Sequence, residues 1–268
     1  MEKLNNQILS ALKSEFQSYK RILIALSGGV DSCLAAYLGR KILGYENVVA
    51  VISNSASLKQ KDLKIATQFC SDHDIKNEII YTNELDNVNY SSNPENRCYY
   101  CKNALYTAMN NLVFKKYNQF KIINGNNYSD LGDYRPGLSS ASEQSVLSPF
   151  INCKVNKKTI RELAFEFNLS VWDKPASPCL SSRFPYGEHI TLKKLERVEK
   201  AEQVLNNYGF DEVRVRSYGD TAKIEVPENQ IQLLSESFLK IEKEIKNSGF
   251  VNCEIDEEGF VSGKMNRF

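Results

Sequence analysis

The chain has 268 residues, of which 42% are hydrophobic and 25% are charged, and its formal net charge is +1. This composition is ordinary for a soluble globular protein of one large or two modest domains. No apolar run approaches the length that spans a bilayer, which argues against a membrane protein. Residues 1–19 predict an amphipathic helix without the apolar core or cleavage pattern of a signal peptide. We therefore expect a cytoplasmic protein with no membrane partner.

Short apolar strands alternate with helical stretches from residue 20 to about residue 170. The pattern predicts strands at residues 21–26, 47–53, 77–81 and 121–124, and helices at residues 31–43, 58–73, 102–117 and 157–167. Such alternation is typical of an α/β fold with a doubly wound parallel sheet, in which ligands bind beyond the carboxyl ends of the strands. Residues 123–127 end the fourth strand and should face the same crevice as the loop after the first strand.

That first loop opens a helix and reads Ser27-Gly28-Gly29-Val30-Asp31-Ser32. Backbone N–H groups of glycines can close around phosphate oxygens, and a helix N-terminus adds partial positive charge. Ser27 and Ser32 offer hydroxyl donors, and Asp31 can hold the Mg²⁺ that accompanies a triphosphate. The loop lacks the Lys of a Walker A motif and the third Gly of a dinucleotide fold. The loop resembles that of the PP-loop ATP pyrophosphatases, although an ordinary Ser/Gly turn is the alternative.

A turn-rich linker with three prolines follows at residues 173–187, and the character of the chain then changes. The pattern predicts a helix that Thr191 caps and Gly209 ends, strands at residues 212–217 and 221–226, a helix at residues 228–247, and a strand pair at residues 252–256 and 259–262. We therefore predict two domains, a nucleotide domain at residues 1–185 and a smaller α+β domain at residues 186–268.

The predicted second domain contains 12 Lys and Arg residues against 16 Asp and Glu residues, which gives a net charge of −4. A domain that grips an RNA backbone is expected to be clearly basic, because phosphate neutralisation dominates that affinity. The charge therefore argues against a nucleic-acid partner.

Seven cysteines are many for a cytoplasmic chain, where a structural disulfide framework is not expected. Cys98 and Cys101 are three positions apart and can share a metal centre or form a redox pair. Cys179 lies in the linker, where no packing periodicity explains it. Three thiolates around a [4Fe–4S] cluster would leave one iron without a protein ligand. The alternative is a zinc site at the pair, with Cys179 as a small hydrophobe. The remaining cysteines are expected to serve packing: Cys33, Cys70, Cys153 and Cys253.

Several segments together resemble the LarE family of sulfur transferases over nearly the whole chain. They are SGGVDS, NRCYYCK, IINGNNYSDLGDYRPG, WDKPASPCLSSRFPYGEHIT and VRVRSYGDTAKIEV. The resemblance implies that ATP adenylates pyridinium-3,5-biscarboxylic acid mononucleotide, whose carboxylates become thiocarboxylates for the nickel-pincer nucleotide cofactor of lactate racemase. It also implies a sulfide donor as a partner and a homo-oligomer, which in relatives is a hexamer of two trimers.

The family has two sulfur sources. One subgroup sacrifices the sulfur of the cysteine that corresponds to Cys179. The other adds a Cys-x-x-Cys pair and binds a [4Fe–4S] cluster with three cysteines, which here would be Cys98, Cys101 and Cys179. The pair places this chain with the cluster type, so that Cys179 would be a ligand rather than a consumed reagent.

Arg214 and Arg216 alternate with valines on one predicted strand and so share a face. Guanidinium groups bind phosphate through paired hydrogen bonds, and the resemblance implies that these two residues, with Arg183, bind the mononucleotide phosphate. The alternative is a surface ion pair with Glu225. One departure from the family is Val261, where relatives often have Arg.

Three other functions share parts of this pattern. A PP-loop tRNA thiolase can also carry a three-cysteine cluster, but the acidic second module argues against it. An amide-forming PP-loop ligase would have no use for the cluster. A nucleotide sensor would bind ATP without releasing pyrophosphate.

Overall fold

The computed structural model describes residues 2–261 and residue 264. Its contacts divide the chain into two compact units. The first unit comprises Met1–Glu84 and Asn96–Ser177, and the second comprises Leu85–Glu95 and Pro178–Phe268. The predicted domain boundary after residue 185 stays a prediction.

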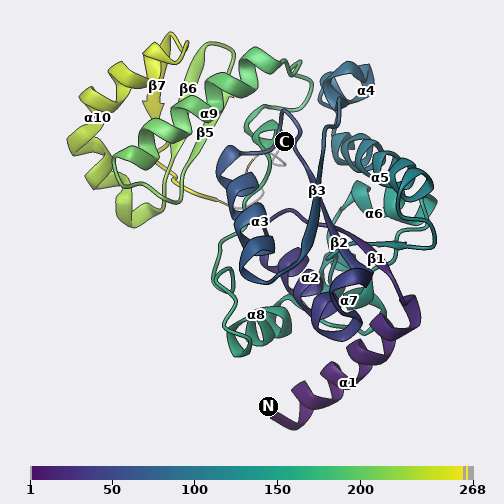
Figure 1. Ribbon diagram of the computed structural model, residues 1–268. Coiled ribbons are helices and arrows are strands. Elements are labelled where there is room, and N and C mark those ends of the chain that lie inside the picture. Colours follow the sequence, from purple (N-terminus) through teal and green to yellow (C-terminus); the bar gives the residue numbers. More distant parts are fainter. Residues whose placement is uncertain (1, 262–263, 265–268) are drawn as a thin grey trace. The chain divides into compact units, whose positions relative to one another are not determined.

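The first unit is built on a four-stranded parallel sheet with the strand order β3-β2-β1-β4 (Figure 1). The strands are β1 (Ile22–Ala25), β2 (Val48–Ser53), β3 (Lys76–Ile80) and β4 (Lys121–Ile123). Ile22 pairs with Val48 on one side and with Lys121 on the other. All four predicted strands are therefore present, and the predicted α/β class is confirmed.

Helices cover both faces of this sheet because its central strands are apolar on both faces. The helices of the first unit are α1 (Glu2–Tyr19), α2 (Val30–Leu43), α3 (Gln60–Asp72), α5 (Arg97–Lys115), α6 (Pro136–Glu143), α7 (Pro149–Asn152) and α8 (Lys157–Glu166). Ile22 and Ile24 pack with side chains of α1, α2, α3, α7 and α8. Leu23, which points the other way, packs with side chains of α5 and α6. The alternation along one strand thus builds two cores.

Helix α5 begins at Arg97, five residues before the predicted start. Cys98 and Cys101 consequently lie inside its first turns rather than in a loop. Residues three apart on a helix are neighbours on its surface, so the two thiols share a face of α5.

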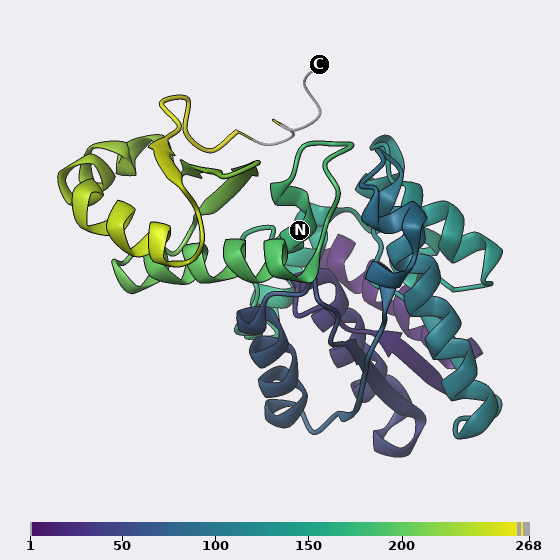
Figure 2. The same cartoon turned by 90° about the horizontal axis from the view of Figure 1, so that it is seen from above.

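The second unit contains a three-stranded sheet with the order β5-β6-β7. Its elements are α4 (Val88–Ser91), α9 (Leu192–Asn207), β5 (Arg214–Tyr218), β6 (Thr221–Glu225), α10 (Ile231–Asn247) and β7 (Asn252–Ile255). β6 runs antiparallel to β5 and parallel to β7. α9 and α10 pack against each other and against this sheet (Figure 2). The predicted small α+β module is therefore present.

Two details of the second unit test the predictions from sequence. Thr191 caps α9 as predicted, because its hydroxyl accepts a hydrogen bond from the Lys194 backbone N–H at 3.3 Å. The predicted strand at residues 259–262 is wrong for residues 259–261, which form no strand; residue 262 lies outside the described residues. The Phe260 N–H donates a hydrogen bond to the Val226 carbonyl at 3.0 Å.

No helix among the described residues is both long enough and apolar enough to cross a membrane.

Candidate functional site

The glycine loop turns the chain from β1 into α2 with a backbone that glycine permits. Gly28 has a φ of +73°, and a Cβ there would lie 3.0 Å from the Asp62 carbonyl oxygen. Gly29 is the N-cap of α2 and has no side chain to satisfy the first N–H groups of that helix. Among the described residues, no side chain caps the first N–H groups of α2, which suits binding of an anion.

The two loop serines bond mainly within the loop. The Ser32 hydroxyl donates to the Gly29 carbonyl at 3.0 Å and accepts from the Ser27 N–H at 3.2 Å. The Ser27 and Ser32 hydroxyl oxygens lie 3.1 Å apart. These bonds hold the loop in shape. A direct role for the hydroxyls toward phosphate stays a prediction.

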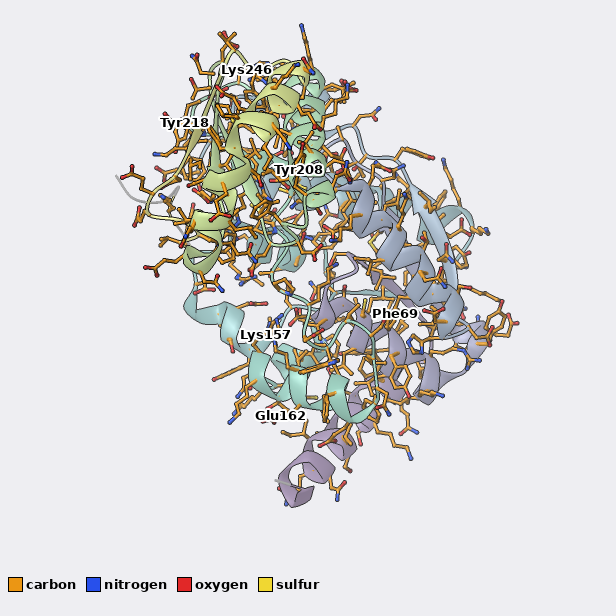
Figure 3. The ribbon with its side chains drawn as sticks, turned by 90° about the vertical axis from the view of Figure 1, so that its left-hand side faces the viewer. Phe69, Lys157, Glu162, Tyr208, Tyr218 and Lys246 are labelled. Atoms are coloured by element: carbon orange, nitrogen blue, oxygen red, sulfur yellow. The ribbon has the colours of Figure 1, made fainter. Side chains whose placement is uncertain are left out.

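Asp31 joins the glycine loop to the end of β4. The Asn127 side-chain amide donates to Asp31 Oδ1 at 3.0 Å. A Cβ on Gly125 would lie 2.6 Å from the Ser32 backbone nitrogen, so the two segments are in close backbone contact. This contact confirms the prediction that residues 123–127 face the glycine loop. The other Asp31 oxygen forms an ion pair with Lys157. Lys157 is the first residue of α8 and is labelled in Figure 3.

Asp130 has a structural role at the same strand end. Its carboxylate accepts from the Asn127 backbone N–H at 3.0 Å, which completes a capping box of a short 3₁₀ helix (Tyr128–Gly132). Arg135 also pairs with Asp130, at 2.9 Å. Asp130 therefore positions the Asn127 backbone, whose side chain in turn holds Asp31.

A second lysine holds the opposite side of the loop. Lys174 Nζ donates to the Gly28 carbonyl at 2.8 Å and to Asp62 Oδ1 at 2.8 Å. Ser177 donates to the other Asp62 oxygen at 2.7 Å, and Asp62 is buried. These bonds tie residues 174–177 of the turn-rich linker to α3 and to the glycine loop.

The seven cysteines are all free: Cys33 and Cys70 are buried, Cys98 is exposed, and the other four are half-buried. Burial raises the pKa of Cys33, Cys70 and Cys253 to about 12 and that of Cys153 to about 11, so these four stay protonated thiols near neutral pH.

The three cysteines of the predicted cluster differ in their exposure. Cys98 is exposed, and Cys101 and Cys179 are half-buried, which suits side chains that must bind iron as thiolates. Cys98 and Cys101 belong to the first unit and Cys179 to the second. The described residues hold no group of three or more His, Cys, Asp or Glu side chains that could bind a metal ion, so the three-cysteine cluster stays a prediction.

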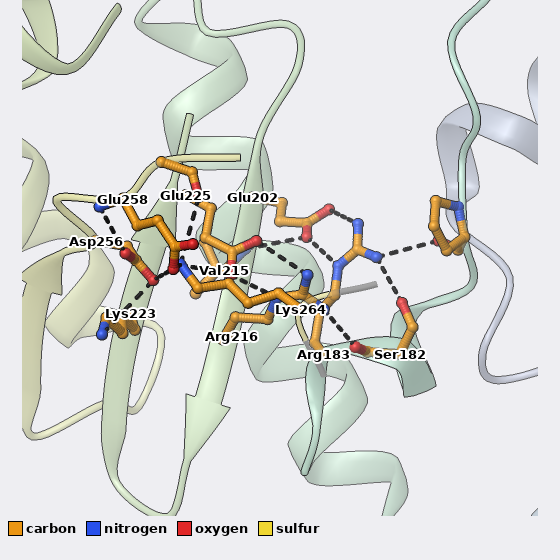
Figure 4. Close-up of polar contacts among 12 residues, drawn as sticks. Ser182, Arg183, Glu202, Val215, Arg216, Lys223, Glu225, Asp256, Glu258 and Lys264 are labelled. Carbon is orange, nitrogen blue, oxygen red and sulfur yellow. Dashed lines mark hydrogen bonds and ion pairs between the residues drawn. The ribbon is translucent and has the colours of Figure 1, made fainter. Parts of the chain in front are cut away.

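Two of the three predicted phosphate-binding arginines lie in a buried ion-pair network of the second unit (Figure 4). Arg183 Nε donates to Glu202 at 2.6 Å, and Arg216 pairs with Glu225 at 2.9 Å. Arg216 also donates to the Ser182 carbonyl at 2.7 Å. The Arg216–Glu225 pair was predicted as an alternative, but as a surface pair. It is buried, because β5 and β6 place both residues on a covered face.

Arg214 differs from its two neighbours. Its guanidinium lies 3.8 Å from the centre of the Phe260 ring, and no carboxylate among the described residues pairs with it. Burial, together with the nearby cations of Arg183 and Arg216, lowers the pKa of Arg214 to about 10, although the carboxylates of Glu225 and Glu202 oppose the shift. An anion at Arg214 would offset this repulsion.

No pattern in the sequence indicates a function for Lys157, Lys174 or Asp62. Lys157 appeared only as the first residue of a predicted helix, and Lys174 only as part of the linker. The one local signal was Asn156, which precedes Lys157 and caps α8 by accepting from the Thr159 N–H at 2.9 Å. The Asn156 cap predicts where α8 begins but does not indicate that Lys157 contacts Asp31.

The described geometry agrees with comparisons to known proteins. A family model described as NAD synthase matches residues 1–113, which include the glycine loop. An NH₃-dependent NAD⁺ synthetase of Fusobacterium nucleatum is 35% identical over 77 residues, 24% of this chain and 30% of its own length.

Two relatives match over almost the whole length. An uncharacterized protein of Synechocystis sp. is 43% identical, with 97% of each chain covered. Pyridinium-3,5-bisthiocarboxylic acid mononucleotide synthase of Lactiplantibacillus plantarum is 31% identical over 257 residues, covering 96% of this chain and 93% of the synthase. With the glycine loop in its expected place between β1 and α2, this chain belongs to the LarE family of ATP-using PP-loop synthases.

Proposed function

We propose that this chain is a cytoplasmic, ATP-dependent sulfur transferase. It adenylates the carboxylates of pyridinium-3,5-biscarboxylic acid mononucleotide and converts them to thiocarboxylates for the nickel-pincer nucleotide. The observation that carries the proposal is the 31% identity over 96% of the chain with the bisthiocarboxylic acid mononucleotide synthase. The glycine loop supports it, because its free helix N–H groups suit the phosphates of ATP.

The chemistry explains why ATP is needed. A carboxylate is a poor electrophile, because its oxygen is a bad leaving group. A substrate carboxylate oxygen attacks the α-phosphorus of ATP, and pyrophosphate leaves with the electrons of the broken P–O bond. The resulting acyl adenylate accepts a sulfur nucleophile at its carbonyl carbon and releases AMP. Each carboxylate consumes one ATP. Asp31 is the Mg²⁺ ligand in this proposal, and Ser27, Gly28, Gly29 and Ser32 shape the phosphate site.

The phosphate of the mononucleotide is assigned to the arginines of the second unit. Arg214 is the principal ligand, because its guanidinium has no acidic partner among the described residues and its burial is costly without an anion. Arg183 and Arg216 already bind Glu202 and Glu225. Their role would be to add positive potential around the phosphate.

The sulfur source in this proposal is a [4Fe–4S] cluster held by Cys98, Cys101 and Cys179. With three protein ligands, the cluster leaves one iron open and would supply sulfide for the acyl carbon. The exposure of Cys98 supports this assignment, because a thiol must be accessible to bind iron as a thiolate. The alternative source is the sulfur of Cys179 itself.

Iron analysis separates the two sulfur sources. After anaerobic purification we expect about four irons per chain. Cys98→Ala should lose them, whereas Cys253→Ala should retain them, because Cys253 lies on β7 and is not one of the proposed cluster ligands. If reconstituted protein stays iron-free, thiolates its substrate once, and loses the sulfur of Cys179 by mass spectrometry, the sacrificial route replaces the cluster.

The substrate is tested by pyrophosphate release. We expect release from ATP only when the biscarboxylate mononucleotide is present, because adenylation precedes the attack of sulfur. Turnover that uses ammonia and survives Cys98→Ala would favour an amide ligase. Tight, steeply salt-dependent binding of tRNA would favour a tRNA thiolase. We also propose a homo-oligomer, which sedimentation analysis tests directly.

A further inference from the structure

Lys157 places a cation directly on the glycine loop. Its Nζ forms an ion pair with the Asp31 carboxylate, one residue inside the N-terminus of α2. The side chains of Lys157 and Asp31 are 40% and 23% exposed, so this pair is open to solvent. An ammonium group has three N–H donors, and Asp31 accepts one of them. Lys157 therefore has donors available beside the N–H groups that suit phosphate.

The backbone of Lys157 is held in place by the segment that also carries Asn127. The Lys157 N–H donates to Ser129 Oγ at 3.2 Å, and the Tyr128 N–H donates to the Val155 carbonyl at 2.8 Å. Asn156 caps α8 at the preceding position. The segment after β4 and the start of α8 thus hold the backbone of Lys157 in place, while its ammonium group is accessible.

The neighbouring lysines lack this combination. Lys174 also touches the loop, but its ammonium donates to the Gly28 carbonyl and to the buried Asp62, and its side chain is mostly buried. Lys158 is 84% exposed and lies 3.9 Å from Glu162 on the outer surface of α8. Lys157 alone among these three combines contact with the loop and accessible donors.

We propose that Lys157 is a substrate-binding residue that contacts a phosphate oxygen of ATP in the glycine loop. The triphosphate carries more negative charge than one carboxylate and competes with Asp31 for the ammonium. A Mg²⁺ ion bound to Asp31 would also favour the move of the Lys157 ammonium from Asp31 to phosphate, since Mg²⁺ and the ammonium would otherwise share one carboxylate. This inference rests on the proposed binding of ATP by the glycine loop, and it adds Lys157 to the residues that bind ATP.

The test is equilibrium binding of ATP to the full chain by calorimetry, with Mg²⁺ and separately with EDTA. Loss of one charge-assisted hydrogen bond weakens affinity by about 10- to 100-fold. We expect Lys157→Met to show this loss in both conditions and Lys157→Arg to recover most of the affinity. Lys158→Met is the matched control and should bind as the wild type does. Thermal melting of each variant verifies folding.

The EDTA condition separates a phosphate contact from mere positioning of Asp31. If Lys157 only oriented Asp31 toward Mg²⁺, the Lys157→Met variant would bind ATP normally in EDTA. That result, or unchanged binding with Mg²⁺, would overturn the inference while leaving ATP use intact. A wild-type protein that binds no ATP in either condition would overturn the ATP-dependent function as well.

Discussion

Gly125→Ala is expected to disable the nucleotide site, because Gly125 lies against the backbone of the glycine loop. A Cβ at this position would lie 2.6 Å from the Ser32 nitrogen and 2.8 Å from the Asp31 carbonyl carbon. Ordinary contact begins at 3.4 Å, so one of the two segments must move by about 0.8 Å (3.4 minus 2.6). The atoms in conflict are all backbone atoms, and no side chain can rotate to relieve them.

The size of the effect follows from that displacement. Overpacking of this kind costs about 1–3 kcal/mol of stability. A loop shift approaching 1 Å also misaligns the N–H donors, and losing one hydrogen bond to a charged group costs about 1.5–3 kcal/mol. We therefore expect Gly125→Ala to weaken MgATP binding by about 10- to 100-fold.

Binding is measured by calorimetry and stability by urea unfolding. Gly132→Ala is the matched control from the same segment, because a Cβ on Gly132 meets nothing within 4 Å. The control should bind MgATP as the wild type does. If Gly125→Ala binds MgATP within about twofold of the wild type and unfolds at the same urea concentration, the proposed backbone conflict is refuted.

Two further predictions concern buried charge and thiol reactivity. Glu202→Gln leaves Arg183 buried without its carboxylate and should lower the free energy of unfolding by about 3–5 kcal/mol. Glu196 is exposed on the same helix, and Glu196→Gln should change the free energy of unfolding by less than about 0.5 kcal/mol. Equal urea midpoints for the two variants would contradict the role of the buried Arg183–Glu202 pair. Iodoacetamide at pH 8 should alkylate the exposed Cys98 of the iron-free protein long before it alkylates Cys70. Burial raises the pKa of Cys70 to about 12, so the Cys70 thiolate is scarce until the pH approaches 12. Peptide mass spectrometry measures both rates, and labelling of Cys70 as fast as Cys98 would contradict the prediction.

The sequence by itself determined the elements of the fold and the nucleotide loop, because both depend on local patterns. Apolar runs such as residues 22–25 and 48–53 became central strands, and the loop that starts at Ser27 has the glycines its backbone requires. The approach of residues 123–127 to the glycine loop was also predicted, since parallel strands bring their carboxyl ends to one edge of the sheet.

The ends of the helices were harder to predict from the sequence. α5 extends back over the Cys-x-x-Cys pair, although the helix was predicted to begin after it. The reason is tertiary: Arg97, the first residue of the helix, is buried. Packing of this kind outweighs the weak propensities that set helix ends in a sequence pattern.

Only the tertiary structure decided which side chains surround Asp31. Asn127 and Lys157 lie 96 and 126 residues further along the chain, and both reach Asp31 because β4 pairs directly with β1. The same holds for Arg183 and Glu202, which a linker turn and a helix bring together in a buried pair. Local patterns specify which segments form, but contacts at such separations depend on strand order and packing, which no single segment encodes.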